Sequence, residues 1–202
     1  MTHFPALARR LNYKTKSDGN HYANYSVYYD EIAEDCQNRC VYCDAMLEEI
    51  GGEGMNLDHF KPQKHFLSLA NDPSNLVLAC FRCNRLKSDW WPEKDGTCNN
   101  GQHGFIDPFS PDKDTYFLVE ENGEITPKKV PYGYMVELMN LNRISRVAIR
   151  RRRTLQLHAD QLIEQILLEL DNLANLPVEQ IRQRADVLSA ALKQVRLIMT
   201  GK

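Results

Sequence analysis

Residues 75–87 read Asn75-Leu76-Val77-Leu78-Ala79-Cys80-Phe81-Arg82-Cys83-Asn84-Arg85-Leu86-Lys87. The run from Asn75 to Cys80 is short and apolar, which predicts a buried strand. From Phe81 to about Asp89 the pattern favours a short helix, with Asn84 and Lys87 one turn apart on one face. The stretch therefore predicts a strand followed directly by a helix, with a Cys-x-x-Cys pair at the junction.

A second Cys-x-x-Cys pair, Cys40 and Cys43, lies upstream of Cys80 and Cys83. Four thiolates can hold Zn²⁺ tetrahedrally, and this spacing lets one turn present two sulfurs to one ion. The two pairs predict a structural zinc site. Two alternatives stay open: Cys36 replaces Cys40 as a ligand, or the four are unrelated buried thiols.

The segment between the two pairs, residues 44–79, is longer than a simple zinc ribbon requires, and it contains Leu57-Asp58-His59-Phe60-Lys61-Pro62. Leu57 to Phe60 is typical of a strand edge, which Lys61-Pro62 ends because proline restricts its predecessor and donates no hydrogen bond. With the strand and helix expected in residues 75–89, this gives two strands and a helix, which around one cation form a ββα-metal arrangement.

The ordered set resembles the HNH endonuclease family. That family's pattern is Cys-x-x-Cys, then Asp-His, then Asn, then Cys-x-x-Cys-(His or Asn)-x-x-Lys. The chain has every position in order, with Asn84 rather than His at the third catalytic place, and the resemblance covers roughly residues 36–92.

The resemblance implies catalytic roles for Asp58, His59, Asn75 and Asn84. Asp58 and Asn84 are expected to bind a catalytic divalent cation, Mg²⁺ or Mn²⁺, through oxygen atoms. His59, on the opposite side of the strand from Asp58, is expected to take a proton from the attacking water, since imidazole changes charge near neutral pH. Asn75 is expected to fix the loop and orient His59. A histidine without chemistry is the alternative for His59.

Nucleic-acid contacts are expected from four further residues, Lys61, His65, Arg85 and Lys87. Lys87 has the alternative of a solvated helix residue. His103 and Asp107 are weaker candidates for a position near the metal, and loop positions are favoured for both.

The rest of the chain predicts an α+β fold with three parts: an N-terminal segment 1–35, a zinc-stapled nuclease core 36–110, and a region 111–202 with a β-hairpin followed by helices. Asn122-Gly123 between two β-prone runs predicts the hairpin, with positive φ at both turn positions. After Pro131 apolar residues recur at helical spacing, and Pro177 is expected to open the last helix. The recurring residues are Leu155, Leu162, Ile166, Leu170 and Leu173, then Ile181, Leu188, Leu192 and Val195.

A basic stretch contains Arg143, Arg146 and the run Arg150 to Arg153. Three interpretations are open for it: a solvated helix face, a grip on a phosphate backbone, or a surface that docks on another subunit. The net charge of −2 argues against binding nucleic acid by bulk electrostatics alone.

The chain has 202 residues, of which 43% are hydrophobic and 26% charged, which is typical of a soluble globular protein. It has no apolar run near the roughly 20 residues that cross a bilayer, and no secretory leader is recognisable, so a cytoplasmic location is expected. In a reducing compartment, paired cysteines are more often metal ligands than disulfides.

These observations predict a metal-dependent HNH endonuclease that acts on DNA, although RNA and single strands stay open as substrates. The motifs Asp-His-Phe, Asn-Leu-Val-Leu-Ala-Cys and Cys-Asn-Arg-x-Lys are also similar to those of nuclease subunits in Septu-type and retron-associated bacterial anti-phage systems. That similarity implies an ATPase partner, expected on the C-terminal helices. A zinc-stapled binding module without catalysis is the alternative, and a toxin nuclease with an immunity protein is a third interpretation.

Overall fold

The computed structural model describes residues 3–93, 95–173 and 177–200. It divides into two compact units, Thr2–Arg150 and Arg151–Lys202. Helix α4 (Ile144–Leu173) begins in the first unit and continues into the second. The boundaries expected at residues 35/36 and 110/111 stay predictions.

The centre of the first unit is a two-stranded antiparallel sheet of β1 (Met55–His59) and β2 (Leu76–Cys80), followed directly by α2 (Phe81–Lys87). Each residue of β2 is buried, as its apolar run predicts. The predicted strand–strand–helix arrangement is confirmed. The first strand is shifted relative to the prediction: it begins at Met55 and ends at His59, before Phe60.

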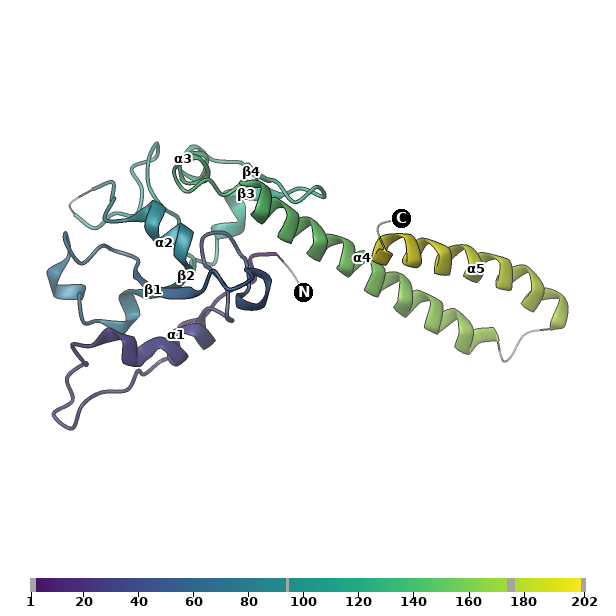
Figure 1. Ribbon diagram of the computed structural model, residues 1–202, viewed down its shortest axis with the longest axis horizontal. Coiled ribbons are helices and arrows are strands. Elements are labelled where there is room, and N and C mark those ends of the chain that lie inside the picture. The colour runs from purple at the N-terminus through teal and green to yellow at the C-terminus, as the bar shows by residue number, and fades with distance from the viewer. Residues whose placement is uncertain (1–2, 94, 174–176, 201–202) are drawn as a thin grey trace. The chain divides into compact units, whose positions relative to one another are not determined.

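Helix α1 (Tyr29–Asp35) covers one side of this sheet and α2 lies on the other (Figure 1). Tyr28 and Ile32 are fully buried there, and they join the core formed by the apolar residues of both strands. The connecting segments contain short 3-10 helices, at Tyr25–Tyr28, Leu47–Glu49, Leu67–Leu69, Pro73–Asn75 and Lys113–Thr115.

The predicted hairpin is present as β3 (Phe117–Val119) paired with β4 (Ile125–Pro127). Its turn differs from the expectation, because Gly123 has a positive φ of 88° and Asn122 does not. Asn122 instead accepts a hydrogen bond at its side-chain oxygen from the Glu124 amide, at 2.9 Å. The longer turn thus needs the left-handed conformation only at glycine.

After the hairpin, α3 (Val130–Leu138) packs against β4, and α4 follows. In the second unit, α4 and α5 (Val178–Thr200) form a helical hairpin whose buried contacts come from Ile166, Leu188 and Val195 (Figure 1). The amides of Gln180 and Ile181 donate to the carbonyl of Pro177, which immediately precedes α5 rather than lying within its first turn as predicted. No helix among the described residues has the length and apolarity needed to span a membrane.

Candidate active site and metal centre

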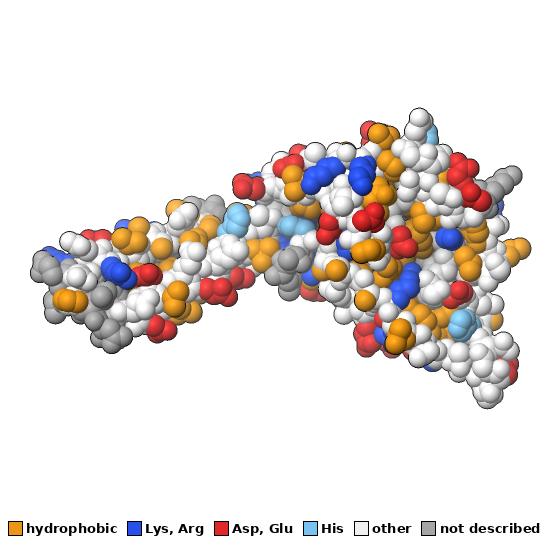
Figure 2. All heavy atoms as spheres, turned by 180° about the vertical axis from the view of Figure 1, so that it is seen from behind, with side chains coloured by type: hydrophobic (Ala, Val, Ile, Leu, Met, Phe, Trp, Pro, Cys, Tyr) orange, Lys and Arg blue, Asp and Glu red, His pale blue; other side chains and the backbone are white. Residues whose placement is uncertain are grey.

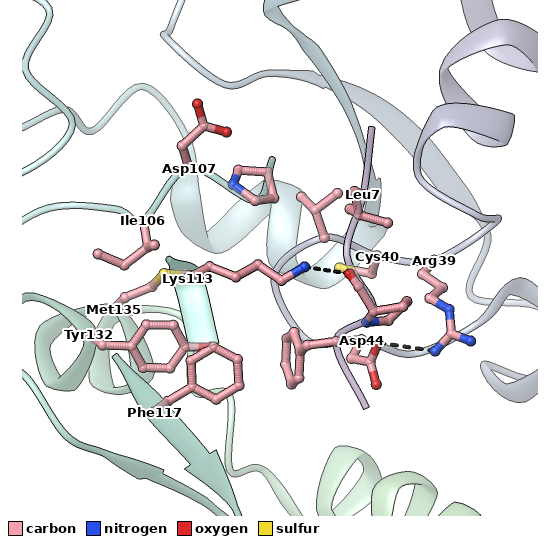
Figure 3. Close-up of a pocket in the computed structure, with 14 residues that line it drawn as sticks. Leu7, Arg39, Cys40, Asp44, Ile106, Asp107, Lys113, Phe117, Tyr132 and Met135 are labelled. Atoms are coloured by element: carbon pink, nitrogen blue, oxygen red, sulfur yellow. Dashed lines mark hydrogen bonds and ion pairs between the residues drawn. The ribbon is translucent and has the colours of Figure 1, made fainter. Parts of the chain in front are cut away.

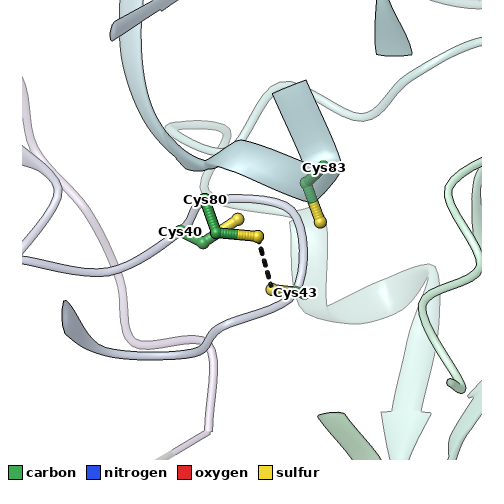
Figure 4. Close-up of side chains that lie close together, drawn as sticks. All are labelled: Cys40, Cys43, Cys80 and Cys83. Atoms are coloured by element: carbon green, nitrogen blue, oxygen red, sulfur yellow. Dashed lines mark hydrogen bonds between the residues drawn. The ribbon is translucent and has the colours of Figure 1, made fainter. Parts of the chain in front are cut away.

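Four cysteine side chains meet at the junction of β2 and α2 (Figure 4). The Sγ atoms of Cys40, Cys43, Cys80 and Cys83 lie within 4.8 Å of one another, and all four residues are buried. The Sγ atoms of Cys43 and Cys80 are 3.9 Å apart. A tetrahedral Zn²⁺ with Zn–S bonds of about 2.3 Å places its sulfurs about 3.8 Å apart. The donor set therefore fits the expected structural zinc.

Cys36 is outside this cluster, and its Sγ accepts a hydrogen bond from the Leu78 amide at 3.4 Å. Burial raises the pKa of the Cys36 thiol to about 11. Of the two ligand sets that the spacing left open, the structure therefore has the one with Cys40.

Three arginines of the basic stretch lie inside the first unit. Arg143, Arg146 and Arg150 are buried; in the rest of the run, Arg151 and Arg152 are exposed and Arg153 is buried. The interpretations of a solvated face and of a phosphate grip are wrong for Arg143, Arg146 and Arg150, because their guanidinium groups bond to protein atoms. Periodicity alone did not reveal this, since the partners come from distant segments.

Asp58 lies on β1 in a nearly closed environment, with an exposed fraction of 6%. The Tyr42 hydroxyl donates to its Oδ2 at 2.6 Å, and the Lys87 Nζ is 3.2 Å from the same oxygen. Burial raises the pKa of the Asp58 carboxyl, and the attraction of Lys87 offsets only part of that rise. Asp58 is thus held by two donors, with lone pairs left for a cation.

Lys87 occupies a position that differs from the expected phosphate contact. It is fully buried, and its Nζ donates to the His59 carbonyl at 2.8 Å in addition to pairing with Asp58. Burial lowers the pKa of Lys87 in spite of the nearby carboxylate. Neither a surface phosphate ligand nor a solvated residue fits this placement.

His59 is also largely buried, with an exposed fraction of 8%. Its Nε2 lies 2.9 Å from the Ala70 carbonyl oxygen, and the Tyr25 ring packs edge-on against the imidazole at 4.8 Å between centroids. A carbonyl can only accept, so Nε2 carries the proton and Nδ1 of the neutral ring has the basic lone pair. Among the described residues, none hydrogen-bonds to Nδ1.

Asn75 ties down the loop that follows His59. Its Nδ2 donates to the Lys61 carbonyl at 2.9 Å and lies 3.5 Å from the Leu69 carbonyl, and its Oδ1 accepts from the Lys61 amide at 3.0 Å. Leu69 immediately precedes Ala70, the residue whose carbonyl bonds to His59. Asn75 therefore fixes both ends of the loop that holds the imidazole.

One open pocket of about 280 Å³ brings together three of the four predicted catalytic residues, Asp58, His59 and Asn84, whereas Asn75 does not line it. Asp58 and His59 enter it from β1 and Asn84 enters it from α2, while Tyr25 and the loop from Pro62 to Lys64 complete the wall. Successive strand residues point to opposite faces, yet both Asp58 and His59 border this pocket at the end of the strand. Carboxylate and amide oxygens, such as those of Asp58 and Asn84, are ligands of the kind that hard divalent cations prefer.

The remaining candidates are more scattered. His65 is near the pocket, bonded to the Asp89 carbonyl at 2.9 Å, and Lys61 packs over the Phe66 ring. Arg85 is exposed and lines a different hollow, next to Arg82. His103 is an exposed loop residue packed against Tyr134, as favoured from the sequence.

Asp107 borders a separate apolar pocket (Figure 3). Phe4, Phe117, Met135 and Lys113 line it, and the Lys113 Nζ donates to the Pro5 carbonyl. Neither Asp58, His59 nor Asn84 lines it. The largely apolar lining and the internal bond of Lys113 favour a packing role for this region.

Sequence reasoning missed Tyr25 and Tyr42. Tyr42 lies between the two cysteines of the first pair. That position in the sequence indicates that Tyr42 is near the metal centre, but not that it contacts Asp58. Tyr25 belongs to an aromatic N-terminal stretch without periodicity. On the face drawn in Figure 2, basic, acidic and apolar side chains are interspersed, in line with the small net charge.

Two comparisons with known proteins agree with this geometry. Residues 40–89 match the family HNH endonuclease. The Septu protein PtuB of Bacillus thuringiensis is 27% identical over 120 residues, which are 59% of this chain and 43% of that relative. The match thus spans less than half of the relative's length. Residues 40–89 therefore match an HNH endonuclease domain, and this range includes the four-cysteine metal centre and the pocket residues Asp58, His59 and Asn84.

Proposed function

We propose that the chain is a metal-dependent endonuclease that hydrolyses phosphodiester bonds in DNA. The observation that carries the proposal is the shared pocket of Asp58, His59 and Asn84 inside the HNH domain. A zinc-stapled binding module would need the four cysteines but would have no use for a basic imidazole nitrogen beside a carboxylate.

His59 acts as the general base in this proposal. The Ala70 carbonyl holds the Nε2 proton, so Nδ1 is available to take a proton from water. A positioned base of this kind contributes about 10²- to 10⁴-fold to the rate. Asn75 positions it by fixing the loop between Lys61 and Leu69.

Asp58 and Asn84 would hold the catalytic cation, Mg²⁺ or Mn²⁺. When bound, such an ion supplies charge stabilisation for the phosphate and for the departing 3′ oxygen. Lys87 and Tyr42 orient the Asp58 carboxylate through its remaining lone pairs. Lys61, His65 and Arg85 would contact the nucleic-acid backbone, the first two beside the pocket and Arg85 on the adjacent surface of α2.

A plasmid-cleavage assay with a titration of Mg²⁺ or Mn²⁺ tests this assignment in Asp58→Ala. The matched control is Asp186→Ala, which removes an exposed carboxylate from the C-terminal unit. We expect cation-dependent cutting by the control and none by Asp58→Ala. Equal cutting by the two variants would show that Asp58 is not needed for catalysis. If the wild-type protein cuts no DNA, either alone or with a partner protein, the binding module without catalysis is favoured.

We further propose that the chain is the nuclease subunit of an anti-phage defence complex with an ATPase. The similarity to a Septu protein supports the defence role. Exposed leucines on α4 support a protein partner at the C-terminal helices, since Leu167 and Leu168 have exposed fractions of 56% and 64%. The cytoplasmic location expected from the sequence is part of the same proposal.

The partner is tested by co-purification of the tagged full chain from its host during phage infection. Leu167→Glu with Leu168→Glu is expected to lose an ATPase that the wild-type chain retains. Gln165→Glu is the control, because it adds charge at a neighbouring polar position. Retention of the ATPase by the leucine variant would place the contact elsewhere, and recovery of no ATPase would contradict the proposal.

A further inference from the structure

Three arginines at the start of α4 approach the four-cysteine centre together. Arg143 precedes the helix, and Arg146 and Arg150 follow at intervals of three and four residues, which places them on one helical face. All three are buried. None of them belongs to the matched range 40–89.

Arg143 points its guanidinium group at sulfur. Its Nη2 is 3.5 Å from the Sγ of Cys83, 3.6 Å from that of Cys80 and 3.9 Å from that of Cys43. Its other bonds go to backbone carbonyls of Met139 and Asn140. Across the described ranges, no carboxylate lies within ion-pair distance of Arg143, so the sulfurs are its counter-charge.

Arg146 and Arg150 complete the contact. The Nη2 of Arg146 is 3.4 Å from the Cys80 Sγ and also pairs with Glu53. The Nη1 of Arg150 donates to the Cys43 carbonyl at 3.4 Å, and its Nη2 donates to the Leu141 carbonyl at 3.0 Å. Arg150 thus binds the backbone of a ligand residue, whereas Arg143 and Arg146 bind the ligand atoms themselves.

The negative charge of a zinc ion bound by four thiolates explains why guanidinium groups lie beside the sulfurs. Four thiolates and one Zn²⁺ carry a net charge of −2, and burying such a charge without compensation is strongly unfavourable. Two guanidinium groups at the sulfurs supply +2 at short range, and the Glu53 carboxylate paired with Arg146 offsets one of these charges.

We propose that Arg143 and Arg146 are charge-compensating residues of the zinc centre, so that zinc retention depends on the docking of the first turns of α4. The metal holds the two cysteine pairs together, and the arginines neutralise the sulfurs from a third segment about 60 residues further along the chain. Zinc loss then releases the start of α4, and displacement of α4 weakens the zinc site.

The test is the rate at which a chelator removes zinc from the full-length protein. Arg143→Met with Arg146→Met removes both charges and keeps apolar volume, and Arg151→Met with Arg152→Met makes the same charge change at exposed positions of the same helix. We expect zinc affinity to fall by about 10- to 100-fold in the first variant, as for other groups that surround metal ligands, and release to accelerate accordingly. The exposed pair should leave the rate unchanged.

Arg143→Lys with Arg146→Lys separates charge from packing. The lysine variant is expected to restore most of the zinc retention lost in the methionine variant. Substitution with Co²⁺ provides a spectroscopic check, because the thiolate-to-cobalt band should persist in every variant that still binds metal through four sulfurs. Equal rates of zinc release from the wild type and the methionine variant would overturn the proposal. Zinc release from the lysine variant as fast as from the methionine variant would overturn it as well.

If the methionine variant does not fold, a second measurement on the wild-type protein tests the proposal instead. In the wild-type protein, hydrogen exchange of the amides in residues 146–150 is followed while zinc is withdrawn. The proposal predicts that these amides lose protection at the same zinc occupancy as residues 40–45. Protection of the α4 amides that persists after complete zinc removal would overturn it.

Discussion

The Nζ of Lys87 lies 3.2 Å from the Asp58 Oδ2 and 2.8 Å from the His59 carbonyl oxygen. One buried side chain of α2 thus connects two adjacent pocket residues of β1 to the helix that carries Asn84. The relative position of the three pocket residues depends on this link. Lys87 therefore has a structural role, whereas the sequence predicted that it contacts phosphate.

Lys87→Met should destabilise the protein strongly, because it leaves Asp58 charged, buried and without its cationic partner. Breaking one side of a buried ion pair lowers the free energy of unfolding by about 3–5 kcal/mol. Urea unfolding measures the change, and Arg85→Met is the matched control because Arg85 is an exposed residue of the same helix. A loss no larger than that of the control would mean that the pair contributes little to folding.

Cys40→Ser should lose zinc, whereas Cys36→Ser should keep it. The Cys40 Sγ belongs to the four-sulfur cluster, and the Cys36 Sγ is bonded to the Leu78 amide instead. Metal analysis of the purified proteins is expected to give about one zinc per chain for Cys36→Ser and far less for Cys40→Ser. The reverse result would restore Cys36 as the ligand.

Cys36 should resist alkylation near neutral pH in the folded protein. Burial raises the pKa of its thiol to about 11, and only the thiolate is nucleophilic. Because the thiolate fraction grows as pH rises toward that value, the alkylation rate should increase about tenfold per pH unit between pH 8 and 10. Mass spectrometry after iodoacetamide treatment measures it; a plateau below pH 9 would contradict the raised pKa.

Asn75→Ala should impair cutting more than it impairs folding. The variant loses the bonds to Lys61 and Leu69, which costs about 1–3 kcal/mol of stability. The loop that carries Ala70 then holds His59 less firmly, and a misplacement of about 1 Å can lower a rate by about 10²-fold. The measurement pairs kcat with urea unfolding. Wild-type kcat in a folded variant would show that the loop does not position the base.

The local elements near the site were predictable because each had a strong pattern within a few residues. The apolar run that ends at Cys80 predicted a buried strand, and the pattern from Phe81 predicted the helix that follows it. The roles expected for Asp58, His59 and Asn84 came from a resemblance, and the structure brings the three residues into one pocket. Asn-Gly predicted the hairpin but not its turn, because Glu120 and Glu124 pair outside it.

Long-range partnerships were not predictable. A lysine or arginine is expected at the surface unless its oppositely charged partner is known. Asp58, the partner of Lys87, is 29 residues away in the sequence, and the cysteines that Arg143 contacts are 60 or more residues away. Buried cations of this kind are uncommon unless they are paired. Only the folded chain shows that one neutralises a carboxylate and the other a cluster of thiolates.

The most direct measurement is plasmid nicking by the full chain with Mg²⁺ or Mn²⁺, compared between the wild type, His59→Ala and His103→Ala at matched zinc content. His103 is an exposed histidine outside the pocket, so its variant controls for loss of an imidazole. We predict cation-dependent nicking by the wild type and by His103→Ala, and a loss of at least about 10²-fold in His59→Ala. Nicking by His59→Ala at the wild-type rate would contradict the assignment of His59 as the base.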